Sequence, residues 1–306
     1  MDVGLEIQRP RGAGGVRRFS HEAMATSFEV YASHPDQHYA SQAAQAAFGL
    51  ADRLEGELSR FIPNSDIARI NNLAAGESMR VSPSTLECLL IARHMFDLTG
   101  GAFDVSIGTG LPLLELDPDD VVVRATQDGV RVDLGGIGKG YAVDLMAELL
   151  EEWDVAVALV HGGFSSVLAL ESPAGGEGWP VTLSDPGDRS RVLARLPVRQ
   201  TAVGASGSRK GDHIIDPRTG EAARGRLAAW VAVPRPKRAS AGMSVGMALR
   251  AAAVADALTT ALMILTIEEI EALFQRTPGF EAWILPTSAG RSEGEPTLLH
   301  FGSAAP

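Results

Sequence analysis

The chain has 306 residues, a formal net charge of −11 at pH 7 and a hydrophobic fraction of 45%. Such a length can bury a large core in one domain or two lobes. The acidic balance argues against a nucleic-acid-binding surface, which normally needs a basic patch. A lone cysteine, Cys88, excludes an internal disulfide and a cysteine-rich zinc site.

The N-terminal segment has no apolar run of signal-peptide length and no lipid-attachment cysteine. An uninterrupted apolar stretch of about 18 residues is also missing elsewhere, so we expect no membrane span. As written, the sequence predicts a cytoplasmic protein, and a chain whose leader had been removed would read the same way.

The first half of the chain alternates strand and helix patterns. Residues 1–17 are rich in glycine and arginine and predict a flexible lead-in, so residues 18–306 are expected to form a single domain. SFEVYAS alternates in part and predicts a strand. Residues 39–61 carry apolar side chains at helical spacing. SPSTLECLLIARHMFDLTGG begins with capping candidates and ends at two glycines, which is typical of a complete helix.

The second half mixes the same elements without a regular βα alternation. GVRVDLGG predicts a strand and a glycine-rich turn, followed by a helix that runs to Trp153. VAVALVHGGFSSVLALES predicts two buried strands joined through Gly162 and Gly163. Further strands are expected at WPVTLS, RVLARLPV, RLAAWVAVP, GFEAWILPT and TLLHF, with a helix at VADALTTALMIL. This mixture predicts an α+β fold, or mixed α/β with antiparallel sheet.

The glycine-rich turn VDLGGIGKGYAVD, residues 132–144, opens a helix. Such turns expose backbone N–H groups that bind phosphate well. The stretch is not a P-loop, because Lys139 is followed by Gly140 instead of serine or threonine. By itself it supports a phosphate site and a purely structural turn about equally.

A second polar stretch, GDHIIDPRTGE, spans residues 211–221. Asp216 precedes a proline, which favours a rigid turn. His213 could act as a general base because its ordinary pKa lies close to neutral. A structural hydrogen-bonding role is the competing interpretation for one histidine beside a turn.

The apolar helix VADALTTALMIL contains an ionisable residue, Asp256, and a hydroxyl at Thr260. These residues are spaced i, i+4 and lie one turn apart on the same face. Two oxygen donors on one rigid face could form part of a hard-cation site. Alternatively, Asp256 pairs with an arginine and Thr260 bonds back to a helix carbonyl.

Six segments in order resemble the ApbE family of FAD:protein FMN transferases. They cover roughly residues 20–300: Met24-Ala25-Thr26, LSRFIPNSDIARIN, TGGAFD, DLGGIGKGYAVD, Ser206-Gly207 with HIIDPRTG, and ADALTTAL. The resemblance implies an ApbE-like fold with two closely packed lobes, in which mixed or antiparallel sheets are flanked by helices. It also implies transfer of the FMN half of FAD to a threonine or serine of an acceptor protein as a phosphoester, with release of AMP.

The same resemblance implies site residues and a cofactor. Mg²⁺ would be ligated by Asp256, Thr260 and the backbone carbonyl of Gly138, and His213 would deprotonate the incoming hydroxyl. Met24 would pack on the flavin ring, and Lys139 would steady the diphosphate. FAD-binding positions carried over by motif are Met24, Ala25, Thr26, Asp104, Gly136, Ile137, Lys139, Asp144, Ser206, Gly207, Ile215 and Asp216.

The chain departs from the family pattern at two places that bear on the site. Gly138 replaces the usual alanine, which leaves a carbonyl ligand possible but loosens the turn. HGGFSS, residues 161–166, stands where a Gly-Gly followed by Asp or Ser is common. Two other functions stay open: an Mg²⁺-dependent FAD pyrophosphatase that gives FMN and AMP, and a flavin-binding protein without catalysis.

Overall fold

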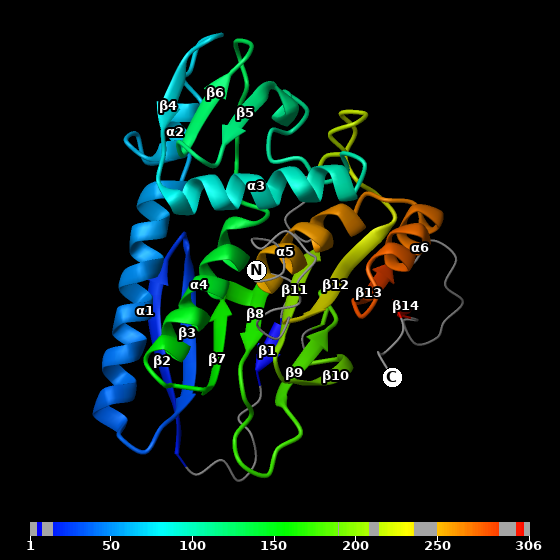
Figure 1. Cartoon of the computed structure of the whole chain (residues 1–306). Coiled ribbons are helices and arrows are strands. Elements are labelled where there is room, and N and C mark those ends of the chain that lie inside the picture. Colours follow the sequence, from blue (N-terminus) through cyan, green and yellow to red (C-terminus); the bar gives the residue numbers. More distant parts are fainter. Residues whose placement is uncertain are drawn as a thin grey trace.

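An eight-stranded antiparallel sheet forms the centre of the molecule (Figure 1). The computed structural model describes residues 5–7, 15–188, 190–207, 214–235, 250–287 and 298–302. In the order β14-β13-β12-β11-β8-β7-β3-β2, the strands are Leu299–Phe301, Glu281–Pro286, Arg226–Pro234, Thr201–Gly207, Ser166–Ala169, Val157–Gly162, Thr26–Ser33 and Val16–Ala23. The antiparallel pairing of these strands confirms the α+β class.

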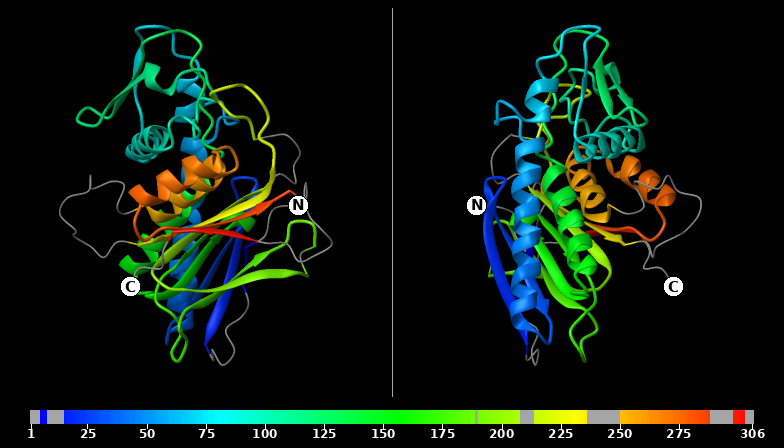
Figure 2. Two further views of the ribbon diagram at one scale, coloured as in Figure 1. Left: turned by 90° about the vertical axis from the view of Figure 1, so that its right-hand side faces the viewer. Right: turned by 60° about the vertical axis from the view of Figure 1, so that its left-hand side comes forward.

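Helices cover one face of this sheet. They are α1 (Gln37–Leu58), α4 (Gly138–Glu152) and α5 (Ala251–Leu262), and Figure 2 shows them on one side of the strands. Because side chains alternate along a strand, Ala229 and Val231 of β12 pack under the helices, whereas Ala228 and Trp230 point to the opposite face. Near-continuous burial along β12 follows from covering both faces.

A three-stranded sheet covers the other face, in the order β1 (Leu5–Ile7), β9 (Trp179–Ser184) and β10 (Val192–Val198). Leu5 is fully buried in the core between the two sheets. The expected flexible lead-in therefore contains a strand that belongs to the fold. Three residues are too few to show a strand pattern, and β1 forms because β9 offers it an edge with which to pair.

The remaining elements cap one end of the helical layer (Figure 1). They are α2 (Asp66–Ile70), β4 (Ser78–Arg80), α3 (Pro83–Leu98), β5 (Leu114–Asp117) and β6 (Val122–Ala125), with a 3₁₀ turn, η1, at Leu111–Leu113. α3 crosses the end of α5 and closes the core there. A second 3₁₀ turn, η2 (Gly163–Ser165), joins β7 to β8, and α6 (Ile267–Arg276) follows α5.

Most expected elements are confirmed, but a second prediction, besides that of the lead-in, is wrong. The residues GVRVD do not form a strand: Val132 donates its N–H to Asn71 Oδ1 (2.6 Å) and accepts from Asn71 Nδ2 (2.9 Å). An amide side chain from 61 positions away thus replaces the strand partner. Elements that were not predicted include the helix α6 and the strands β2, β4, β5, β6 and β11.

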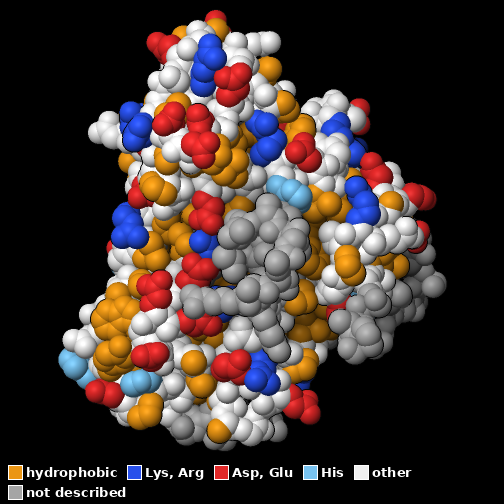
Figure 3. Space-filling model, in the orientation of Figure 1, with side chains coloured by type: hydrophobic (Ala, Val, Ile, Leu, Met, Phe, Trp, Pro, Cys, Tyr) orange, Lys and Arg blue, Asp and Glu red, His pale blue; other side chains and the backbone are white. Residues whose placement is uncertain are grey.

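The described surface mixes charges. Figure 3 shows acidic and basic side chains interspersed across the face seen in Figure 1. None of the helices in the described ranges is both long and apolar enough to cross a membrane.

Candidate active site

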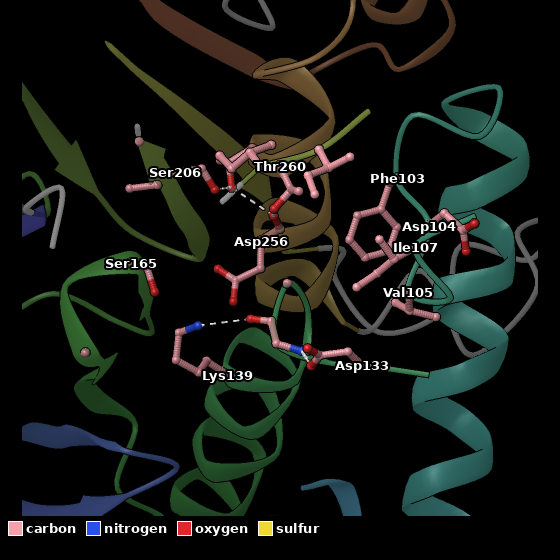
Figure 4. A pocket seen from close by; sticks show the side chains of 18 of the residues that line it. Phe103, Asp104, Val105, Ile107, Asp133, Lys139, Ser165, Ser206, Asp256 and Thr260 are labelled. Carbon is pink, nitrogen blue, oxygen red and sulfur yellow. Dashed lines mark hydrogen bonds between the residues drawn. The ribbon is translucent and has the colours of Figure 1, made fainter. Parts of the chain in front are cut away.

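A pocket of about 630 Å³ lies where the glycine-rich turn before α4, the C-terminal half of α5 and the end of β11 meet (Figure 4). The β2–β3 turn, the loop after α3 and η2 complete its walls. The six motif segments that lie far apart in the sequence therefore contribute to one cavity, or to the elements that hold it.

The helices α4 and α5 meet tightly beside this pocket. A Cβ at Gly140 would lie 2.5 Å from the carbonyl carbon of Ala252 and 2.9 Å from the amide nitrogen of Ala253. A Cβ at Gly204 of β11 would lie 2.7 Å from the carbonyl carbon of Ala255. Real Cβ atoms do not approach so closely, so both positions need glycine. This close packing sets where α5 presents its polar side chains.

Asp256 is the central polar group of the site. It lines the pocket but is 5% exposed. Its Oδ2 accepts from the Gly140 N–H (2.8 Å), and the Ser166 hydroxyl lies 2.7 Å from Oδ1 and 2.8 Å from Oδ2. Burial raises the pKa of Asp256 to about 6, against the lowering effect of the Lys139 charge and of these two donors.

Two threonines follow Asp256 on α5. The Thr259 hydroxyl donates to the Asp256 carbonyl (2.8 Å) and lies 2.9 Å from Ser206 Oγ. Thr260 Oγ1 is 3.4 Å from the same carbonyl, a long contact, and lines the pocket. A Cβ added at Gly136 would lie 3.5 Å from Thr260 Oγ1, so the glycine-rich turn passes close to this hydroxyl.

The glycine-rich turn supplies Lys139, whose positive charge acts on Asp256. Lys139 donates to the Gly135 carbonyl (3.3 Å), and Figure 4 shows Lys139, Ser165 and the Asp256 carboxylate facing the same space. Asp133 accepts from the Gly135 N–H (2.9 Å) and pairs with Arg60 (2.8 Å). These contacts hold the turn open towards the pocket.

Two loops at the pocket carry unusual backbone. Met24 and Ala25, which form the β2–β3 turn, have φ of +50° and +55°. Ile107 has φ +50° and is 56% exposed. A β-branched residue in this region is strained. Asp104 organises the Ile107 loop, because its carboxylate accepts from the N–H groups of Ser106 (2.8 Å) and Gly108 (2.9 Å).

The structure brings most predicted site residues to the pocket. Those that line it are Met24, Ala25, Thr26, Asp104, Gly136, Lys139, Ser206, Gly207, Ile215, Asp256 and Thr260. His213 lies outside the described residues, although Ile214, the next residue, lines the pocket.

Four predicted residues do not line it. Ile137 is fully buried in the core, and Gly138 is buried in the first turn of α4. Asp216 pairs with Arg218 (2.9 Å), which lowers the pKa of that carboxyl. Asp144 is buried and accepts from the N–H groups of Ala252 (3.0 Å) and Ala253 (2.9 Å) at the start of α5. Its observed role is to cap that helix.

Sequence reasoning missed other contributors. The pocket is also lined by Phe103, Ile107, Phe164 and Ser165. Ser166 does not line the pocket, but its hydroxyl donates a hydrogen bond to the Asp256 carboxylate. HGGFSS was noted as a departure from the family pattern, but nothing in its sequence indicates that one of its hydroxyls reaches Asp256.

The donor set suits a hard divalent cation. No group of three His, Cys, Asp or Glu side chains that could hold a metal occurs among the described residues. One buried carboxylate and one pocket hydroxyl, next to a glycine-rich turn, instead fit Mg²⁺, which retains waters and is completed by phosphate oxygens. A bound cation would also offset the unfavourable free energy of burying the Asp256 carboxylate.

Comparison with known proteins places the chain in a family. The family model described as ApbE matches residues 24–284. The chain belongs to the ApbE family. Two relatives named FAD:protein FMN transferase support this: that of Treponema pallidum is 26% identical, covering 92% of this chain and 88% of the relative, and that of Salmonella typhimurium is 24% identical, covering 81% and 82%.

Solved structures share the fold. The flavin transferase ApbE from Vibrio cholerae superposes with a TM-score of 0.76 at 20% identity, covering 94% of this chain and 97% of that one. The ApbE protein from Thermotoga maritima gives 0.77 at 22% identity with the same coverage. The ApbE fold expected from the motifs is therefore confirmed.

Proposed function

We propose that this chain is an FAD:protein FMN transferase that uses Mg²⁺ and moves the FMN half of FAD to a threonine or serine hydroxyl of an acceptor protein. The acceptor oxygen forms a bond to the phosphorus of the FMN half, the bond from that phosphorus to the bridging oxygen breaks, and AMP leaves. The acceptor hydroxyl loses its proton in the same overall step. Membership of the ApbE family and the names of the relatives support this reaction.

The observation that carries the proposal is the convergence of Asp256, Thr260, Lys139 and the glycine-rich turn in one pocket. Asp256 and Thr260 would hold Mg²⁺, and a backbone carbonyl of the turn, predicted to be that of Gly138, would complete the protein ligands. The ion would neutralise charge on the diphosphate as AMP departs. Mg²⁺ favours such an oxygen set over nitrogen or sulfur donors.

The chain's own groups bind and orient the dinucleotide. Lys139 is placed to contact the diphosphate as a point charge. Met24 and the exposed apolar side chains of Ile107 and Phe164 offer surfaces for the flavin ring. His213 is predicted to accept the proton of the acceptor hydroxyl, and its neighbour Ile214 lines the pocket, which is consistent with that role.

The test follows AMP and the acceptor together. Purified protein would be incubated with FAD, Mg²⁺ and a threonine-containing acceptor domain, with and without EDTA. We expect metal-dependent AMP release and an acceptor mass increase equal to FMN less one water. A matched acceptor in which that threonine is alanine should stay unmodified.

Two variants sharpen this experiment. Asp256→Asn should lose metal-dependent turnover, whereas Asp188→Asn, which removes a carboxylate outside the pocket, should leave it unchanged. AMP accompanied by free FMN, with every acceptor unmodified, would replace the transferase with an FAD pyrophosphatase. Normal turnover by Asp256→Asn would remove the proposed metal role.

A further inference from the structure

Ser166, the first residue of β8, is a fully buried serine that contacts the site carboxylate. Its Oγ lies 2.7 Å from Asp256 Oδ1 and 2.8 Å from Oδ2, so one hydroxyl is shared between both oxygens. The neighbouring hydroxyl of Ser165 lines the pocket, whereas Ser166 does not. Ser166 therefore does not touch a bound substrate itself. Its shortest polar contacts are with the Asp256 carboxylate, and the Ser165 hydroxyl lies farther away, at 3.3 Å.

Three elements hold this one carboxylate. α5 carries it, the N-terminal turn of α4 donates the Gly140 N–H to Oδ2, and β8 donates the Ser166 hydroxyl. An ionised carboxylate has about four lone-pair positions. Two donors therefore fix its orientation and leave capacity for the pocket that Asp256 lines.

We propose that Ser166 is a positioning residue, which orients the Asp256 carboxylate so that its free lone pairs face a divalent cation in the pocket. This inference rests on the metal role in the proposed function. Partners that hydrogen-bond a ligating carboxylate hold its orientation, and losing one typically weakens metal binding or activity by about 10- to 100-fold.

Burial alone does not account for the Ser166 contact. Ser184 of β9 is equally buried, yet its hydroxyl has no hydrogen-bond partner in the described structure. A serine hydroxyl in this core is thus tolerated without a carboxylate. Ser184→Ala is consequently a matched control, because it removes a fully buried hydroxyl from a strand outside the pocket.

The test measures Mn²⁺ binding to the full-length protein without FAD, by calorimetry or by loss of the free-ion paramagnetic signal. For Ser166→Ala we expect the Kd for Mn²⁺ to rise at least about 10-fold, at a temperature where the melting curve shows that the variant is fully folded. Ser166→Cys leaves no cavity but is a weak donor, and it should behave like Ser166→Ala. Ser184→Ala should bind Mn²⁺ as the wild type does.

Turnover gives an independent readout. The Mg²⁺ concentration that half-activates AMP release should rise for Ser166→Ala by a factor similar to the change in Kd, whereas kcat at saturating Mg²⁺ should recover to near the wild-type value. A Mn²⁺ Kd unchanged in Ser166→Ala would overturn the inference and leave the proposed function intact. Wild-type protein that binds no Mn²⁺ and turns over in EDTA would overturn both.

Discussion

Asp144 and Asp256 cap each other's helices. Asp144 of α4 accepts from the N–H groups of Ala252 and Ala253 in the first turn of α5, and Asp256 of α5 accepts from the Gly140 N–H in the first turn of α4. Neither helix has a capping side chain of its own, since the positions before them are Ile137 and Arg250. The Asp256 carboxylate of the candidate site therefore also links α4 to α5.

Gly140→Ala should disturb the close packing of α4 against α5. The added methyl group would overlap the backbone of Ala252, so α4 and α5 must separate, at a cost of about 1–3 kcal/mol or more. Turnover should fall together with stability, because Asp256 moves with α5. Urea unfolding and AMP release measure the two effects.

The control for this change is Gly49→Ala in α1, where an added Cβ meets no atom within 4 Å. It should stabilise the protein by roughly 0.5–1 kcal/mol and leave turnover unchanged. Equal effects of the two substitutions would refute the close-packing argument.

Asp144→Ala should destabilise the protein although Asp144 does not line the pocket. It leaves the buried N–H groups of Ala252 and Ala253 without their acceptor, and each such loss costs about 1–3 kcal/mol. We expect a lower urea midpoint and a reduced affinity for Mn²⁺, because the start of α5 frays. Thr266→Ala, which removes the capping box of α6, should cost only about 1 kcal/mol and not change Mn²⁺ binding.

The metal-free protein should lose stability as the pH rises through neutrality. Burial raises the pKa of Asp144 to about 7 from an ordinary value of 3.8. A raised folded-state pKa means that the native state binds the proton more tightly than the unfolded chain. The stabilisation that the protonated Asp144 provides is thus complete below about pH 4 and is lost as the pH rises to about 7.

At about 1.4 kcal/mol per pKa unit, the expected loss is on the order of 2–4 kcal/mol. Urea unfolding at several pH values between 4.5 and 8 would measure the slope. Asp144→Asn should reduce it in part, because the raised pKa of Asp256 contributes in the same direction. The pKa of Glu29 is shifted in the opposite direction, since His161 and other partners lower it to about 2. The contribution of Glu29 to stability therefore changes only at pH values below this range. An unaltered slope in Asp144→Asn would rule out Asp144 as its source.

Ile107→Gly should separate function from stability at the pocket rim. The left-handed backbone at φ +50° costs a non-glycine residue roughly 1–2 kcal/mol, and the entropy of glycine in the unfolded chain offsets about 0.5–1 kcal/mol of the relief. Stability should therefore change by about 1 kcal/mol or less. KM for FAD or for the acceptor should rise, because an exposed apolar contact is lost.

Asp154→Gly is the control, since Asp154 has nearly the same φ (+55°) just after α4 but does not line the pocket. Glycine is favoured at this position of a helix end. Asp154→Gly should keep both KM values. A KM increase in both variants would show that backbone freedom, and not the Ile107 side chain, is responsible.

Lys139→Met should weaken FAD binding more than it affects the fold. Lys139 lines the pocket, and methionine keeps the apolar stem while removing the charge. A charged hydrogen bond contributes about 1.5–3 kcal/mol, so we expect Kd for FAD to rise by about 10- to 100-fold, with a Tm near the wild-type value. Equilibrium titration of FAD fluorescence measures this. Unchanged affinity would place the diphosphate away from Lys139.

Local sequence patterns predicted the elements that have strong hydrophobic periodicity or clear start and stop residues. The long helix α1 was identified from its apolar spacing, and α3 from its capping residues and terminal glycines. β7 and β8 were identified because two apolar runs flank Gly162 and Gly163. β11 and the amphipathic helix α6 were not anticipated. GVRVD failed as a strand because Asn71 takes up its backbone groups, a contact that no local pattern contains.

The sequence by itself determined the class of fold, the family and eleven of the residues that line the pocket. These depend on residue type and on spacing within a segment. Only the tertiary structure decided that Asp144 caps a helix and that Ser166 and Gly140 hold Asp256 across 90 and 116 positions of chain. The physical reason is that such bonds require backbones to approach closely, which Gly140 and Gly204 permit by having no side chain.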